Sequence, residues 1–212
     1  AKNRKDKDND DDNAPPAPSA KSQYNFTDPD SKIMPGSDKK SFIQGYNGQI
    51  AVDKKNQIII ANDLCANPND INQLPPMIDK IEENINGLPD EVSADAGYYS
   101  EKNVKYLREK LIAPYISPDK QRHRISMKSP RGRITSNMST AERMRRWLKT
   151  KRGRERYALR KITVEPVFGQ IKSGMDFTQF SLRGLENAKG EWDLVCLCHN
   201  LLKLFRNQVS MG

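Results

Sequence analysis

The stretch GQIAVDKKNQIIIA, residues 48–61, predicts two adjacent β-strands and decides the fold class. Apolar residues alternate with other residues up to Asp53, a polar break follows at Lys54-Lys55-Asn56, and residues 58–61 are continuously apolar. Two β-rich runs around a short polar break are typical of a hairpin. A continuously apolar strand is typical of a sheet interior. We therefore predict a hairpin whose second strand is buried.

The elements after this hairpin alternate between helices and strands. Apolar residues recur at helical spacing from Ile71 to Ile81, and residues 91–95 form a short apolar run. A helix over residues 101–111 and a strand over 112–116 follow. This alternation predicts an α/β fold, and the leading hairpin makes its helix-flanked sheet mixed. The order is that of a ribonuclease H-like fold whose first strand is missing.

Composition separates three regions of the 212 residues. Residues 1–23 contain no apolar residue larger than Ala and a Pro/Ala run, so we predict a disordered linker there. Residues 24–206 are expected to form one domain that is incomplete at its N-terminus, and residues 207–212 a tail. No apolar run approaches the ~20 residues that span a bilayer. Three sparse cysteines favour a reducing compartment over a disulfide framework.

A strongly basic segment precedes the closing helices. Between residues 120 and 161 there are sixteen Lys or Arg against two acidic residues, in a chain of net charge +9. Such a surface favours a polyanionic partner, and we interpret residues 118–156 as a basic insertion. Trp147 within it is interpreted either as core packing or as a base-stacking residue. In the final helix, about residues 185–205, an apolar stripe runs from Leu185 to Phe205, and Cys196 and His199 are interpreted as core residues.

Two carboxylates are the candidate catalytic residues. Asp95 ends the strand 91–95, where α/β sheets place their ligands, although a turn Asp before Gly is an alternative. Glu165 precedes Pro166, which predicts a helix beginning there with Glu165 at its positive end. An ordinary N-terminal helix Glu is the alternative. Lys172 lies about two turns further on and is expected on the same face. Carboxylate oxygens suit hard divalent ions, which in pairs catalyse phosphodiester chemistry.

Several motifs resemble the DDE transposases of bacterial insertion sequences, over about residues 24–206. The matching pieces are Asp28-Pro29-Asp30-Ser31, Gly45-Tyr46-Asn47-Gly48-Gln49, Ala94-Asp95-Ala96-Gly97-Tyr98, Val164-Glu165-Pro166-Val167-Phe168-Gly169-Gln170-Ile171-Lys172 and Arg183-Gly184-Leu185. The resemblance implies that Asp95 and Glu165 are the second and third metal-binding carboxylates, that Mg²⁺ or Mn²⁺ is the cofactor, and that Lys172 contacts DNA.

The sequence departs from the family pattern in two places. Ala158 and Lys161 stand where the family has Tyr and Arg, and Tyr157 and Arg160 are each one residue away. No strand precedes Asp28, so Asp28 and Asp30 are interpreted as turn residues and not as the first catalytic Asp.

The resemblance implies a DDE transposase that cleaves and joins DNA strands at insertion-sequence ends, expected as a homodimer on DNA in the bacterial cytoplasm, at the nucleoid. An inactive DNA-binding remnant without its first Asp is the main alternative, and a ribonuclease H-like nuclease unrelated to transposition is a third. The expected DNA-binding residues are Lys172, Arg160, Lys161, Arg143, Arg145, Arg146 and Trp147.

Overall fold

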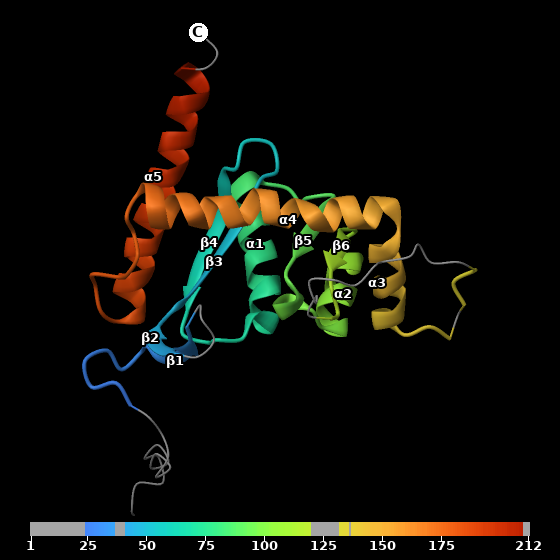
Figure 1. Cartoon of the computed structure of the whole chain (residues 1–212), viewed down its shortest axis with the longest axis horizontal. Helices are drawn as coiled ribbons and strands as arrows, with labels where there is room; N and C mark the ends of the chain where they lie inside the picture. The colour runs from blue at the N-terminus through green and yellow to red at the C-terminus, as the bar shows by residue number, and fades with distance from the viewer. Residues whose placement is uncertain (1–23, 37–40, 120–131, 136, 210–212) are drawn as a thin grey trace, which may run out of the picture.

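The computed structural model describes residues 24–36, 41–119, 132–135 and 137–209, so the predicted linker over residues 1–23 lies outside it. The described residues form a mixed α/β structure (Figure 1). Its strands are β1 (Lys32–Pro35), β2 (Phe42–Gly45), β3 (Asn47–Val52), β4 (Ile59–Cys65), β5 (Glu91–Ala94) and β6 (Ala113–Ile116). Its α-helices are α1 (Leu74–Ile85), α2 (Glu101–Glu109), α3 (Thr140–Lys149), α4 (Lys151–Gly169) and α5 (Leu185–Val209).

The predicted hairpin is confirmed. β3 and β4 pair antiparallel, with Ala51 opposite Ala61. Asp53 organises the turn between them, because its carboxylate accepts the backbone N–H groups of Lys55, Asn56 and Ile58 at 3.0, 2.9 and 2.6 Å. The residues just before β3 form a separate strand, β2, which pairs with β1. The sequence pattern did not reveal β1.

The strands form three two-stranded sheets and not the single mixed sheet that the sequence predicts. β5 and β6 are parallel. The unpaired edges of β3 and β5 run antiparallel to each other. Two contacts show this direction: Gln49 near the start of β3 contacts Tyr98 just after β5, and Lys54 just after β3 lies 3.4 Å from Glu91 at the start of β5. A cavity of about 380 Å³ separates the two edges, and side chains of α1 and α4 complete its lining. The edges of β3 and β5 therefore face each other without pairing.

The apolar face of α1 forms much of one core cluster. Leu74, Met77, Ile78 and Ile81 are buried there together with residues of β4, α2 and β6. These residues include the helical pattern that the sequence predicted, and Pro75 and Pro76 fall in the first turn, where a missing N–H is tolerated.

Helix α4 corrects the prediction that a helix begins near Pro166. It begins at Lys151 and carries Pro166 in its interior, so Glu165 lies deep in the helix and not at its positive end. A proline there leaves the carbonyl of the residue four positions earlier without a partner. That residue is Ile162, and its carbonyl accepts a hydrogen bond from Gln57 Nε2 at 3.0 Å. The side chain from the hairpin turn thus replaces the absent N–H.

Helix α4 runs across both the β3–β4 and the β5–β6 pairs (Figure 1). Helix α5 packs against β4, with Ala188, Trp192 and Cys196 buried in a second core cluster. Cys196 and His199 are buried, as predicted. The predicted apolar stripe is wrong at its end, because Leu202 and Phe205 are exposed. In the described parts of the chain, no helix combines the length and apolar character needed to cross a membrane.

The turn between α3 and α4 gives a stability prediction. A Cβ at Gly153 would lie 2.0 Å from the Trp147 carbonyl oxygen, which is backbone and cannot move away freely. We expect Gly153→Ala to lower the free energy of unfolding by about 1–3 kcal/mol in chemical denaturation. Gly190→Ala in α5 is the matched control, because nothing lies within 4 Å of its Cβ position. An unchanged stability in Gly153→Ala would contradict this close approach.

Candidate active site

Asp95 follows β5 directly and begins a short 3₁₀ turn, Ala96–Tyr98. Its backbone carbonyl accepts the N–H of Tyr98 at 3.0 Å, while its side chain makes no capping hydrogen bond and is 63% exposed. The sequence prediction that this carboxylate ends a strand is confirmed. Because the Asp95 carboxylate makes no capping hydrogen bond, it can contact residues from other elements.

Three contacts hold the turn after Asp95 in place. Gly97 packs against Asp70, where a Cβ would lie 2.8 Å from the carboxylate. Asn103 donates to the Tyr98 carbonyl at 2.8 Å, and the Tyr98 hydroxyl donates to Gln49. Burial raises the pKa of Tyr98, and the charges of Asp70 and Asp95 raise it further. The hydroxyl therefore stays protonated and remains a donor.

Arg160 brings the two candidate carboxylates together. Its guanidinium contacts Asp95 Oδ1 and lies 3.6 Å from Glu165 Oε1. The side chain is only 15% exposed, whereas Asp95 and Glu165 are 63% and 61% exposed. The guanidinium also lies over the ring of the buried Tyr157, 4.8 Å from its centroid, which adds a cation–π contact. A cation thus sits between two carboxylates from β5 and α4.

Asp70 is a site residue that the sequence did not reveal. With Asp95, Arg160 and Glu165 it lines the cavity between β3 and β5. Its carboxylate accepts hydrogen bonds from Asn47 at 2.7 Å and Gln49 at 3.0 Å. Asp70 stands directly before the helical pattern that begins at Ile71. No local signal indicated that Asp70 would meet the Asp95 turn, since that contact depends on the tertiary fold.

Asp95 and Glu165 are the two carboxylates that Arg160 joins at this place, and Asp70 lines the same cavity. Their oxygens are the hard donors that Mg²⁺ and Mn²⁺ prefer. Within the part of the chain that the structure describes, no group of three or more His, Cys, Asp or Glu side chains is arranged to hold a metal ion. The oxygens of Asp95 and Glu165 are thus of the chemical kind that suits a divalent ion, while the described residues do not surround one with three ligands.

Lys172 lies apart from the two carboxylates. It belongs to a π-helical turn, Gln170–Gly174, and lines a different cavity of about 740 Å³, together with Arg183 and several aromatic side chains. The structure brings Lys172 and Arg183 to one cavity, but it does not bring Lys172 into the cavity of Glu165. Lys172 thus lies in the turn that directly follows α4.

The other expected DNA-binding residues lie on α3 and α4. Arg145 forms a bidentate ion pair with Asp119, at 2.7 and 2.9 Å. Arg146 donates to the Gly132 carbonyl at 2.6 Å, and Lys161 is exposed. Trp147 is partly exposed and stacks on Tyr115, with ring centroids 5.9 Å apart. Arg143 lies on α3 beside them.

Asp28 and Asp30 bind groups at Tyr46 and at the start of α5, and not at Asp95. Asp28 accepts the Tyr46 hydroxyl at 2.8 Å and the Gly184 N–H at 3.2 Å. Asp30 accepts the Leu185 N–H at 2.9 Å, where α5 begins. Two motifs far apart in the sequence therefore meet, and the acidic pair stabilises the positive end of α5.

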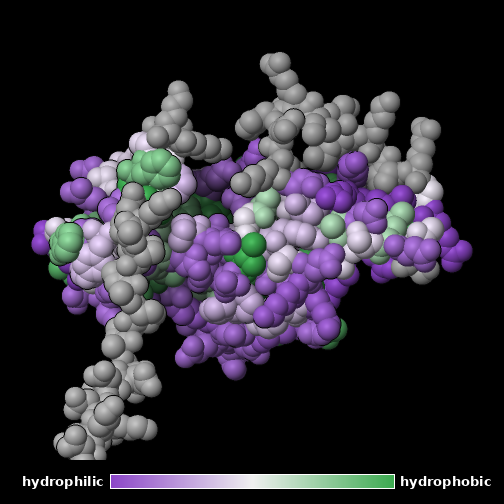
Figure 2. Space-filling model, turned by 90° about the horizontal axis from the view of Figure 1, so that it is seen from below, coloured by the Kyte–Doolittle hydropathy of each residue, from purple (hydrophilic) through white to green (hydrophobic). Residues whose placement is uncertain are grey.

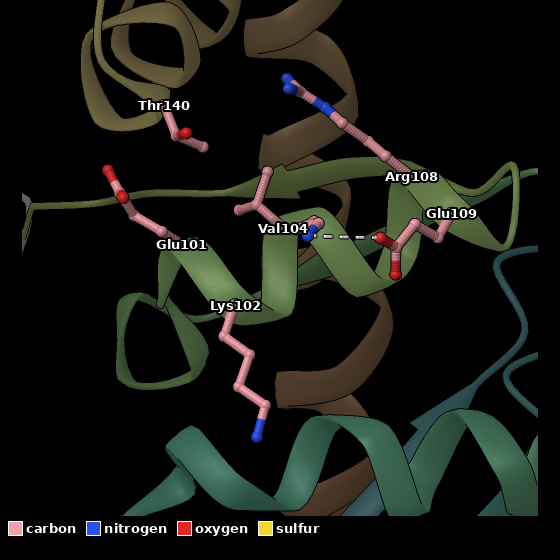
Figure 3. Close-up of a pocket in the computed structure, with 7 residues that line it drawn as sticks. Glu101, Lys102, Val104, Arg108, Glu109 and Thr140 are labelled. Atoms are coloured by element: carbon pink, nitrogen blue, oxygen red, sulfur yellow. Dashed lines mark ion pairs between the residues drawn. The ribbon is translucent and has the colours of Figure 1, made fainter.

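Two further surfaces, a hollow over α2 and the face drawn in Figure 2, lie outside the candidate site. A hollow over α2 is lined by Glu101, Lys102, Arg108 and Thr140, with Lys105 and Glu109 paired at 3.7 Å (Figure 3). Hydrophilic residues cover most of the face drawn in Figure 2. These charges are solvated, and an exposed pair of this kind contributes little to stability.

The fold and the site define a mixed α/β protein with a pair of carboxylates beside a basic helix. The transposase DDE domain family matches residues 15–201, and the chain belongs to this family. Comparison with curated proteins and with solved structures finds no match. Membership associates the chain with DNA cleavage and transfer in transposition and makes DNA its partner, and proteins of this family generally use divalent metal ions.

The Asp95 turn gives a prediction of its own. Gly97→Ala must displace the Asp70 carboxylate, which two amide side chains hold in place. We expect the free energy of unfolding to fall by about 1–2 kcal/mol, measured by thermal and chemical denaturation. Gly45→Ala serves as control, because nothing lies within 4 Å of its Cβ position. Equal stabilities of the two variants would rule out the close packing of Gly97 on Asp70.

Proposed function

We propose that this chain is the catalytic region of a transposase that cleaves DNA at insertion-sequence ends and transfers the strands to a target. Asp95 and Glu165 are its metal-binding catalytic residues. The observation that carries the proposal is the contact of Arg160 with both carboxylates. It means that groups from β5 and α4 converge on one point beside a basic helix.

Mg²⁺ or Mn²⁺, when bound, activates the attacking oxygen and stabilises the leaving one. Asp95 and Glu165 would hold the ion. Arg160 contacts both carboxylates, so its single positive charge offsets part of their negative charge, and a guanidinium at this place could also bind a DNA phosphate. Tyr157 supports the guanidinium from below. Thus the chain positions two acidic ligands and keeps one cation within reach of the substrate.

The basic residues of α3 and α4 provide the DNA-binding surface in this proposal. Lys161 follows Arg160 directly, and Arg143, Arg145 and Arg146 occupy α3, which packs on α4. Cations of this kind bind phosphates and set orientation without reading sequence. Lys172 contacts DNA from the neighbouring cavity, and Trp147 contributes its exposed ring edge. Two copies act together on DNA, at the bacterial nucleoid in the cytoplasm.

We further infer that the first catalytic carboxylate belongs on a strand between β3 and β5. The two facing edges are unpaired, and the cavity between them is lined by apolar residues of α1 and, at one end, by Asp95 and Glu165. A strand antiparallel to β3 would be parallel to β5 and would end beside Asp95. Its last residue would then complete the group of acidic ligands.

A second candidate is a DNA-binding remnant that no longer cleaves. It is favoured by the absence, among the described residues, of any group of three metal-binding side chains. Such a chain keeps its basic surface, so it binds DNA but cannot hold the metal ions firmly enough to act.

Substitution of the carboxylates separates these functions. We expect Asp95→Asn and Glu165→Gln each to lower Mn²⁺-dependent cleavage of DNA from the borders of the element at least about 100-fold. DNA affinity should be retained, because neither residue contributes positive charge. Glu186→Gln is the control, since its side chain is 86% exposed and pairs only with Lys189. Cleavage that survives in a variant would remove that residue from the active site, and binding without cleavage by the unaltered chain would favour the remnant.

DNA binding should weaken steeply with salt, because each neutralised phosphate releases counterions. We expect Lys161→Gln to reduce the slope of log affinity against log salt by about 0.9 for duplex DNA. Lys105→Gln on α2 should leave the slope unchanged, because this 79% exposed residue already pairs with Glu109 and lies on a different helix. Fluorescence anisotropy over a salt series measures both slopes. A flat salt response of the unaltered chain would contradict the proposed surface.

A further inference from the structure

Helix α5 carries two apolar faces, of which only one is covered. Trp192, Cys196 and His199 are buried against the body of the protein. On the opposite side of the helix lie four leucines that are 52–59% exposed, which we call the leucine seam: Leu194, Leu197, Leu201 and Leu204. A helix that is apolar on both sides is normally covered on both sides. The seam is therefore an unpartnered surface.

The anchoring of α5 fixes the direction in which the seam faces. Asn200 accepts the Ile59 N–H and donates to the Ile59 carbonyl, both at 2.8 Å. His199 contacts the Gln57 carbonyl at 3.1 Å, and Lys203 contacts the Gln57 side chain at 2.7 Å. The helix cannot rotate to bury its leucines without losing these contacts. Figure 1 shows the C-terminal part of α5 projecting beyond the other elements.

The spacing of the leucines identifies the kind of partner. Successive steps of three, four and three residues place a leucine at every a and d position of a heptad pattern, beginning at Leu194. Such a pattern fits the knobs and holes of a second helix. Exposed Phe205 extends the same surface. No Lys, Arg, Asp or Glu occupies the seam, so it offers nothing to a nucleic acid.

A second copy of this chain is the occupant that the seam itself matches. A seam with leucine at all a and d positions is complementary to itself, and a two-fold axis lets each copy contribute the same patch. Of the flanking positions, Cys198 and Asn200 are uncharged, and Asp193 accepts a hydrogen bond from Asn62 of its own chain, although the chain has a net charge of +9. Two-fold pairing would remove eight leucine side chains from water.

We propose that the leucine seam of α5 is a homodimer interface, in which the helices of two copies pack together. The seam residues do not line the cavity of Asp95 and Glu165. The interface is thus independent of the catalytic proposal, and either can fail without the other.

Sedimentation equilibrium of the whole chain over a concentration series tests the interface. We expect reversible association that ends at twice the chain mass of 24.2 kDa. The double variant Leu197→Glu/Leu201→Glu should raise the dimer dissociation constant at least about 100-fold, because it replaces buried leucines with charges. Ile162→Glu on α4 is the matched control, since that side chain is 65% exposed on another helix.

Circular dichroism and thermal denaturation of each variant establish that it is folded. Dimerisation of the unaltered chain and of Ile162→Glu, with a folded monomeric double variant, supports the interface. A chain that stays monomeric throughout the series overturns it. So does a double variant that dimerises like the unaltered chain, or association that continues beyond two copies.

Discussion

The attachment of helices α4 and α5 to the β3–β4 hairpin depends on one residue, Gln57. It stands in the hairpin turn with a left-handed φ of 58°, a conformation that costs a residue other than glycine or asparagine free energy. Its amide donates to the Ile162 carbonyl of α4, and its own backbone and side chain receive His199 and Lys203 of α5. One turn residue thus joins the β3–β4 hairpin to both long helices. These contacts offset the cost of its backbone conformation.

The continuity of α4 through Pro166 is supported by that arrangement. Helix α4 runs from the β5–β6 pair to the β3–β4 pair, and its Arg160 and Glu165 lie beside the end of β5. Asp95 is held there by the packing of Gly97 on Asp70. Two contacts between segments far apart in the sequence therefore stabilise the elements around the site. One is the hydrogen bond from the Gln57 amide to the Ile162 carbonyl of α4, and the other is the packing of Gly97 on Asp70.

The sequence predicted what depends on local patterns and missed what depends on tertiary contacts. Strand 91–95 and the position of Asp95 at its end followed from a short apolar run. Pro166 was interpreted as a helix start because the compensating contact from Gln57 is 105 positions away and leaves no local signal. Arg160 was expected on DNA, and its place between two carboxylates depends on the packing of α4 against β5. Leu202 and Phe205 fit an apolar stripe, yet only packing shows which side of a doubly apolar helix is covered.

Paramagnetic broadening by Mn²⁺ in an amide NMR spectrum of the chain tests most directly that Asp95 and Glu165 form one metal-binding site. The signals of the turn after β5 and of the middle of α4 should broaden together at the lowest Mn²⁺ concentrations, with those around Gly97 and Thr163 among the first. Broadening that begins at the acidic residues of α2, or that affects the β5 turn and α4 at clearly different concentrations, would contradict a shared site.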